Sequence, residues 1–254
     1  MKIDNEKSRL ANIADNSLYA YGVNPATIEA SFRIFKRYLT DGPTLELGPA
    51  EGIMTDLLVS TCSSLTVVDG AQKFLDSIKK KHPKVEAVNA LFEEFVPVSK
   101  FDNIILGHVL EHVENPVEIL RRASSWLNPG GRILAAVPNS RSLHRQAAVL
   151  MGLLPREDAL NEADQHHGHR RVYSPETFRA DFLKAGLWIE VSGGYWLKPL
   201  SNGQIERDWT PAMLDAFMIL GERYPDIAGE TYVVARNEPS TQSLRNTWQK
   251  EDKT

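Results

Sequence analysis

Short apolar segments alternate with longer amphipathic ones through the first half of the chain. The short runs predict strands at Thr44–Leu47, Leu65–Val68, Val85–Val88, Asn103–Leu106 and Arg132–Val137. Between them, apolar residues recur at helical spacing and predict helices at about Gly52–Ser60, Ala71–Lys80 and Pro116–Leu127. Strands that alternate with helices indicate a mostly parallel sheet with helices on both faces.

The pattern changes on either side of this region. Upstream, Asn24–Leu39 predicts a helix, with Pro25 in its first turn. Downstream, the sequence predicts helices at Ala147–Leu154, Ser174–Ala185 and Pro211–Gly221, a polar loop at Arg156–Arg171, and strands at Leu187–Val191 and Thr231–Ala235. The prediction is an α/β domain with seven strands and an N-terminal helical part. The tail from Glu238 to Thr254 is polar and unpatterned, which predicts a loose segment.

Composition narrows the function classes. The chain has 254 residues, 29 Lys and Arg, 33 Asp and Glu, and a formal net charge of −4, which argues against an electrostatic grip on nucleic acid. The single cysteine, Cys62, excludes an intrachain disulfide. The polar N-terminus lacks the apolar core of a signal peptide, and no apolar run is long enough to span a bilayer. We therefore expect a cytoplasmic protein with no membrane partner.

The most informative segment joins the first strand to the first helix. It reads Leu45-Glu46-Leu47-Gly48-Pro49-Ala50-Glu51-Gly52, and its glycines favour either a tight turn or a ligand close to main-chain amides. A dinucleotide fingerprint needs glycines at the first, third and sixth places, which here hold Gly48, Ala50 and Ile53. A dehydrogenase is therefore disfavoured. Glu46 suits a cationic ligand, and Asp69, which ends the second strand, can accept both ribose hydroxyls.

Four segments together resemble class I S-adenosylmethionine-dependent methyltransferases. They are Glu46–Gly52, Asp69, Phe101–Pro116 and the turn Leu127–Leu134, and they fall in the family's order between about Leu39 and Asn139. The small-molecule subgroup, which includes ubiquinone-pathway and natural-product methyltransferases, is the most similar. The chain departs from the family at Ala50, where many members have glycine.

The resemblance implies a Rossmann-like, doubly wound, seven-stranded sheet whose last strand is antiparallel. It also implies a helical lid over residues 1–40, a methyltransferase domain over residues 41–237, and a cap inserted around residues 140–175. The expected cofactor is S-adenosylmethionine. The residues expected to bind it are Glu46, Gly48, Gly52, Asp69, Gly70, Asn89, Ala90, Leu91, His108, Val109 and the lid residue Tyr21.

Each of these residues has a role implied by the family. Glu46 would lie near the ammonium group of the methionine half of the cofactor. Gly48 and Gly52 would let the protein backbone approach that half. Asp69 and Gly70 would hold the ribose. Asn89, Ala90 and Leu91 would contact adenine, and His108 and Val109 the sulfonium. Asn89 departs from the family, where an acid is more common, but an amide can still reach the exocyclic amine.

Methyl transfer to a hydroxyl or N–H group also needs a base, and histidine has a suitable pKa. The candidates are His112, and His166 and His169 in the polar loop. Arg170 and Arg171 could attract an anionic substrate or be ordinary surface charge. Some ubiquinone-pathway relatives use a Glu-His pair around a divalent cation, and His108, Glu111 and His112 could do so. Because a second ligand cluster is missing from the sequence pattern, we expect no metal.

The resulting hypothesis is methyl transfer to an oxygen or nitrogen of a small molecule such as a heterocycle or phenol. Methylation of a surface carbohydrate or nucleotide-linked sugar is an alternative, as is a non-catalytic regulator that binds the cofactor. His108-Val109-Leu110-Glu111 stands where nucleic-acid amino methylases have Asn/Asp-Pro-Pro-Tyr, which argues against a nucleic-acid substrate. The oligomeric state has no signal in the sequence.

Overall fold

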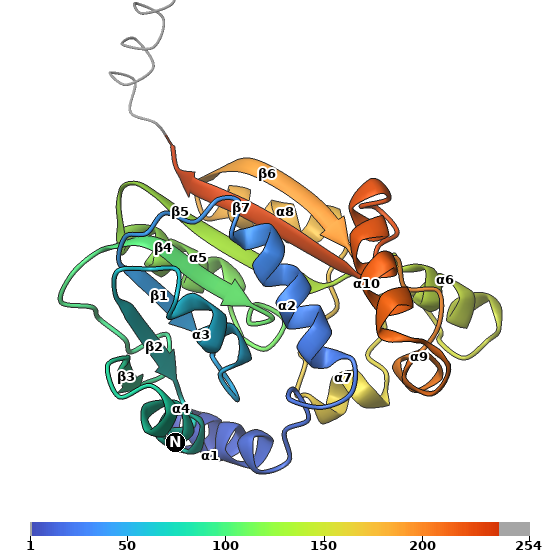
Figure 1. The fold of residues 1–254 in the computed structure, drawn as a ribbon, viewed down its shortest axis with the longest axis horizontal. Helices are drawn as coiled ribbons and strands as arrows, with labels where there is room; N and C mark the ends of the chain where they lie inside the picture. The colour runs from blue at the N-terminus through green and yellow to red at the C-terminus, as the bar shows by residue number, and fades with distance from the viewer. Residues whose placement is uncertain (1, 239–254) are drawn as a thin grey trace, which may run out of the picture.

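A seven-stranded sheet forms the centre of the molecule (Figure 1). The computed structural model describes residues 2–238, so the predicted loose tail lies almost wholly outside the described residues. The strand order is β3-β2-β1-β4-β5-β7-β6. The strands are β1 (Thr44–Leu47), β2 (Leu65–Asp69), β3 (Glu86–Asn89), β4 (Phe101–Gly107), β5 (Leu127–Pro138), β6 (Leu187–Tyr195) and β7 (Glu230–Asn237).

Strand direction matches the sequence prediction. Strands β1 to β5 pair in parallel, whereas β7 runs antiparallel to both β5 and β6. The predicted seven-stranded α/β fold with an antiparallel last strand is therefore confirmed. Because β7 is reversed, its first residues lie at the same edge of the sheet as the carboxyl ends of the other strands.

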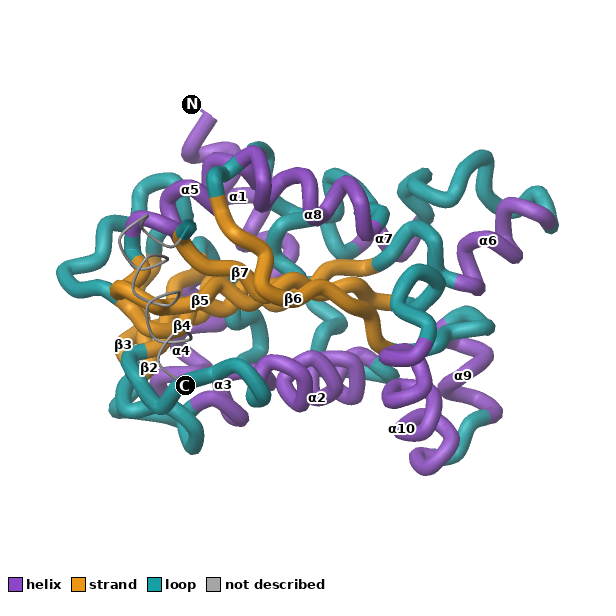
Figure 2. The backbone as a smooth tube through the Cα atoms, turned by 90° about the horizontal axis from the view of Figure 1, so that it is seen from above, coloured by secondary structure: helices purple, strands orange, loops and turns teal. Residues whose placement is uncertain are grey.

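Helices cover both faces of the sheet (Figure 2). One layer holds α2 (Asn24–Phe35), α3 (Ile53–Leu58), α4 (Gln72–Lys81) and α10 (Pro211–Leu220), which ends in a 3₁₀ turn (Gly221–Arg223); the other holds α5 (Pro116–Ser125) and α8 (Pro175–Lys184). Side chains alternate across the strands. Leu45 and Leu47 pack in the core with α5 and α8, whereas Glu46 between them turns toward Thr55 of α3.

Four helices lie outside these two layers. They are α1 (Lys2–Asp15), α6 (Leu143–Leu150), α7 (Glu162–His166) and α9 (Asn202–Asp208). Helix α1 packs on α4, with α7 next to it (Figure 1). The sequence analysis did not predict α1 or α9, and it placed α7 in a loop. These helices are short or mostly polar, and α7 is fixed by a capping box between Asn161 and Asp164 rather than by an apolar stripe.

Other differences are at element ends. Strand β6 continues to Tyr195 beyond the predicted end at Val191. Gly193 and Gly194 can lie inside it because the ring of Tyr232 and the carbonyl of Pro225 occupy the space that side chains would need. Helix α6 begins before the predicted Ala147 and ends at Leu150. None of the helices in the described part of the chain is long and apolar enough to cross a bilayer.

Candidate active site

A cavity of about 520 Å³ lies at the carboxyl ends of the strands. It extends across the sheet from Asp69 on β2, past Gly48 and His108, to Glu230 on β7 and Lys198 after β6. Residues of α1 and of the segment between α6 and α8 also line it. The cavity therefore lies where open parallel sheets bind ligands, beside the central strands.

The turn from β1 to α3 forms the floor of the cavity. Gly48, Ala50 and Gly52 all have positive φ, at 68°, 45° and 82°. A Cβ on Gly48 would lie 3.0 Å from Cγ2 of Val109, so glycine keeps the floor open there. Gly48, Ala50 and Val109 line the cavity, whereas Gly52 is the N-cap of α3 and does not line it.

Two buried carboxyl groups face the cavity beside this turn. Glu46 is 2% exposed and accepts a 2.6 Å hydrogen bond from the Thr55 hydroxyl, and burial raises its pKa to about 8. Asp69 accepts a 2.8 Å hydrogen bond from the amide of Ala71, and burial raises its pKa to about 6. Each group would be stabilised in its charged form by a ligand that supplies a cation or hydroxyl donors.

Helix α1 covers the end of the cavity that lies beside β2 and β3. Gly70, Ala90 and Leu91 line the cavity, and Leu10 of α1 lies where a side chain on Gly70 would be. Asn89, by contrast, does not line it. Its amide donates a 3.0 Å hydrogen bond to the carbonyl of Asp69 and so ties β3 to β2.

The expected lid aromatic differs from the one that the structure places at the cavity. Tyr21 is 66% exposed and does not line the cavity. Tyr19, which the sequence pattern does not distinguish from Tyr21, lines it instead. Its hydroxyl lies 3.0 Å from Nε2 of His112, and its ring stacks on His167 at a centroid distance of 4.7 Å.

His108 is at the centre of the cavity in a left-handed conformation, with φ 58°. Its Nδ1 lies 3.5 Å from Glu111 and 3.8 Å from Glu230, and its Nε2 lies 3.3 Å from the hydroxyl of Tyr195. Burial lowers the pKa of His108, but the nearby carboxylates of Glu111 and Glu230 raise it more, so the net change is upward. His108 is therefore held between two carboxylates.

Two of the three predicted catalytic histidines come together. The rings of His112 and His169 are nearly perpendicular, with centroids 4.7 Å apart. Nδ1 of His169 lies 3.2 Å from Oδ1 of Asp164, and Arg145 lies 3.0 Å from the other carboxylate oxygen. The pKa of Asp164 falls to about 2 because hydrogen bonding to His169 and Asn161 and the charge of Arg145 outweigh burial. Burial lowers the pKa of His112 to about 4.

The rest of the polar loop has mainly structural contacts. His166 is exposed, does not line the cavity, and lies 3.2 Å from the carbonyl of Asn16. Arg170 binds Glu6 and the carbonyl of His112. Arg171 donates to three carbonyls between residues 110 and 114. These arginines therefore fix the polar loop to the segment after β4 and to α1.

Glu111, His112 and His169 could also hold a metal ion. One ligand atom from each lies within 4.8 Å of the others. Both carboxylate oxygens of Glu111 are buried without a hydrogen-bond partner among the described residues. A carboxylate and two imidazoles suit zinc, iron or manganese, so this donor set fits a divalent cation. The sequence analysis named Glu111 and His112 together with His108 and expected no metal; it did not include His169, which is far from the other two along the chain.

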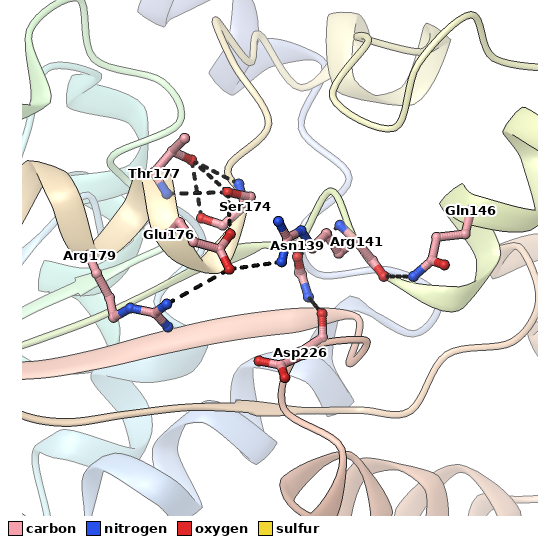
Figure 3. Close-up of polar contacts among 8 residues, drawn as sticks. All are labelled: Asn139, Arg141, Gln146, Ser174, Glu176, Thr177, Arg179 and Asp226. Atoms are coloured by element: carbon pink, nitrogen blue, oxygen red, sulfur yellow. Dashed lines mark hydrogen bonds and ion pairs between the residues drawn. The ribbon is translucent and has the colours of Figure 1, made fainter.

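A network of polar contacts forms the cavity wall at the end of β5 (Figure 3). Asn139, fully buried at the end of β5, donates to the carbonyls of Asp226 and Ala228 and accepts from the amide of Arg141. Arg141 pairs with Glu176 at the start of α8. These bonds hold the β5 end, α8 and the segment before β7 together, and thereby position Glu230.

Several cavity residues had no signal in the sequence. They are Asp164, His144, Lys198 and Glu230, and all come from segments after the recognised motifs. Glu230 and Lys198 reach the site only because β7 and β6 lie beside β5 in the sheet.

Comparison with known proteins agrees with this geometry. A family model described as a methyltransferase domain matches residues 26–190, more than half of the chain. The ubiquinone biosynthesis O-methyltransferase of Pseudoalteromonas translucida (strain TAC 125) is 25% identical over 175 residues, which cover 65% of this chain and 71% of the relative. The protein of the same name from Rhizobium etli is 23% identical over 223 residues, covering 85% and 83%.

Solved structures share the fold. The N-methyltransferase NodS from Bradyrhizobium japonicum WM9, in complex with S-adenosyl-L-homocysteine, has a TM-score of 0.57 and 15% identity over 87% of this chain and 91% of its own. An S-adenosylmethionine-dependent methyltransferase from Mesorhizobium loti has a TM-score of 0.60 and 16% identity, covering 82% and 98%.

The fold and the cavity define an α/β methyltransferase. The chain belongs to the methyltransferase-domain family, so the family expected from the sequence, and methyl transfer as the class of reaction, are confirmed.

Proposed function

We propose that this protein transfers a methyl group from S-adenosylmethionine to an oxygen or nitrogen of a small molecule. The proposal rests on one continuous cavity, which has Asp69 and Gly48 at one end and His112 and His169 at the other. A donor bound at the first end would place its sulfonium near His108, and an acceptor would fill the second end. Methyl transfer is an in-line displacement, so this arrangement supplies proximity and orientation.

Glu46 and Asp69 are the proposed anchors of the cofactor. Glu46 would accept from the ammonium group of the methionine half, and Asp69 from the ribose hydroxyls. Leu10 and Tyr19 of the N-terminal part would cover the cofactor from outside, which supports residues 1–40 as the lid. The family's cofactor supplies an electrophilic methyl group, and the chain supplies its binding and orientation.

His169 is the proposed general base. Asp164 faces its Nδ1 at 3.2 Å, which orients the ring and stabilises the imidazolium that forms when Nε2 takes a proton. His112 is less suited because burial lowers its pKa to about 4 and Tyr19 occupies its Nε2. In this scheme His112 packs against His169 and positions it.

The same cluster supports a second candidate mechanism. A divalent cation on Glu111, His112 and His169 would lower the pKa of an acceptor hydroxyl bound to it. The two mechanisms use His169 differently, and removal of metal separates them.

The first experiment is calorimetric titration with S-adenosyl-L-homocysteine, followed by a screen for turnover with phenols, heterocycles and sugars. We expect micromolar or tighter binding and turnover of a small aromatic acceptor. Turnover of sugars alone would favour the carbohydrate alternative. Binding without any turnover would favour a non-catalytic regulator, and lack of binding would refute the proposed cofactor.

A further inference from the structure

Lys198 is a buried cation that the proposed chemistry does not use. It is 9% exposed, lines the far end of the cavity, and follows β6. Among residues 5–238 its ammonium has no hydrogen-bond partner and no carboxylate within 4.0 Å. Its Nζ lies 4.6 Å from the centroid of the Trp196 ring, in a cation–π contact. A buried ammonium without a counter-ion is costly, so it calls for an explanation.

The other cation nearby is already neutralised. Arg145 binds Asp164 at 3.0 Å and donates to the carbonyls of Glu157 and Ala159. Asn139 likewise uses its whole amide within the wall. These groups are therefore part of the structure, and Lys198 is the charge that remains available at this end.

Two further polar side chains that line the same cavity as Lys198 have unused atoms. Nδ1 of His144 and Oδ1 of Asn202 are buried without a partner in the described part of the chain, and both residues line the cavity. Because rotation of the amide exchanges its oxygen and its nitrogen, the N–H₂ group of Asn202 can take the position of Oδ1. Lys198 and Asn202 then offer donors to one ligand group, and His144, which burial keeps neutral by lowering its pKa to about 2, adds a donor in the tautomer that carries its proton on Nδ1.

The backbone makes room for this arrangement. A Cβ on Gly229 would lie 3.2 Å from Cβ of Lys198, so the lysine stem lies against the start of β7 where a side chain would crowd it. The amide of Gly229 donates a 2.6 Å hydrogen bond to the carbonyl of Trp196, which fixes the two strands at this point. The backbone and the first carbons of the Lys198 side chain therefore lie against the start of β7.

The charge balance selects the kind of group. Burial is the main cause that lowers the pKa of Lys198 to about 8; Arg145 lowers it as well, whereas Glu230, Asp164 and Glu206 oppose the change. Because Lys198 carries one positive charge and Glu230 is nearby, a ligand group with one negative charge suits the site better than a group with two. A carboxylate fits this balance, and a phosphate monoester carries an additional charge that Glu230 would repel.

We propose that the acceptor carries a carboxylate, remote from the methylated atom, which Lys198, His144 and Asn202 bind. This inference rests on the proposed function, because it assigns the acceptor's place opposite the methyl donor. It gives the substrate class as small carboxylic acids that also bear a hydroxyl or amine.

The test uses the full-length protein saturated with S-adenosyl-L-homocysteine. Binding is measured by calorimetry for a panel of phenols and anilines, each supplied as its carboxylic acid, its primary amide and a phosphate monoester analogue; 4-hydroxyphenylacetate and 4-hydroxyphenylacetamide are one pair. We expect the acids to bind about 10- to 100-fold more tightly than the amides, as for a hydrogen bond to a charged group.

Variants assign this preference to Lys198. Lys198→Met should abolish the preference for acids, Lys198→Arg should keep it, and Lys80→Met, on the exposed face of α4, should leave it unchanged. The melting temperature of Lys198→Met should equal or exceed that of the wild type, because the substitution removes an unpaired buried charge. A lower value would mean that the lysine is structural and would overturn the proposal.

Other results also overturn it. These are equal binding of acids and amides, failure of all acids to bind, tighter binding of the phosphate esters, or undiminished acid binding by Lys198→Met. Failure of the protein to bind S-adenosyl-L-homocysteine at the outset would instead refute the proposed function, so the two failures are distinguishable.

Discussion

The hydroxyl of Tyr19 lies 3.0 Å from Nε2 of His112, although 93 residues separate them in the chain. The contact joins the segment after α1 to the loop after β4, directly over the cavity. Arg9 reinforces it by donating to the carbonyls of Gly168 and His112. Polar contacts therefore hold the N-terminal part over the cavity.

The Tyr19 contact predicts how fast the cofactor product leaves. Tyr19→Phe removes one hydrogen bond, which contributes about 0.5–1.5 kcal/mol, so dissociation of S-adenosyl-L-homocysteine should accelerate about 2- to 12-fold. Stopped-flow displacement measures this rate. Tyr21→Phe, at the exposed tyrosine, is the matched variant. Equal rates in the two variants would contradict a lid role for Tyr19.

Asp69 predicts the strength of cofactor binding. Asp69→Asn keeps an acceptor for the amide of Ala71 but removes the charge offered to the ribose. Affinity for S-adenosyl-L-homocysteine should fall by about 1.5–3 kcal/mol, or roughly 10- to 150-fold, measured by calorimetry. Asp76→Asn, on the exposed face of α4, serves as control. Unchanged affinity of Asp69→Asn would remove the ribose assignment.

Glu46 predicts a pH dependence of binding. Its pKa of about 8 means that the free protein carries it mostly protonated at neutral pH. A ligand ammonium favours the ionised form, so binding releases a proton and affinity rises with pH up to about 8, by at most about tenfold per unit. Asp69, whose pKa is about 6, loses its proton at a lower pH than Glu46 does.

Titrations at about pH 6.5 and 8.0, in buffers of different ionisation enthalpy, measure this proton release. Glu46→Gln should bind more weakly at the higher pH and lose the part of the dependence that Glu46 causes. The assignment fails if the variant and the wild type release equal numbers of protons.

The His169–Asp164 pair predicts a loss of turnover without loss of cofactor affinity. His169→Asn and Asp164→Asn should each lower kcat by about 10²- to 10⁴-fold, the usual contribution of general base catalysis. His82→Asn is a demanding control, because His82 also pairs with an aspartate, Asp56 at 2.6 Å, but lies outside the cavity. A comparable loss in His82→Asn would indicate a general effect on folding.

Metal removal separates base catalysis from cation catalysis. If His169 is the base, dialysis against EDTA should leave kcat within about twofold of its starting value, with elemental analysis as the check on metal content. Loss of activity that zinc or manganese restores would show that Glu111, His112 and His169 act as ligands instead.

The sequence could indicate that residues such as Gly48 and Asp69 lie together at one cavity because each of them is next to a strand. Gly48 and Asp69 follow strands that are themselves apolar runs, so strand order fixes their position at one edge of the sheet. Two of the expected cofactor residues do not line the cavity: Asn89 donates to the carbonyl of Asp69, and Tyr21 is exposed whereas Tyr19 lines the cavity. The direction of a side chain at a strand end or within a loop follows no sequence periodicity, so the sequence pattern could not predict it.

The acceptor half could not be predicted because its residues meet only through long-range packing. Asp164 reaches His169 by capping the short helix α7, and Arg145 approaches from α6. Lys198 and Glu230 depend on the insertion of β7 between β5 and β6. None of these residues belongs to a spaced motif, so their meeting is a property of topology rather than of local sequence.

The reversed strand β7 has a consequence for how such enzymes can change. In the proposed function, the donor end of the cavity is formed by residues before Asn139, whereas most residues of the acceptor end come after it. Asn139 and the carbonyls that it binds form the joint, that is, the boundary in the chain between the segments that supply these two ends. A chimera that exchanges the chain from this joint onward with a relative should therefore carry the relative's acceptor preference while keeping its own donor affinity, so that new methylation substrates can arise by recombination at one point.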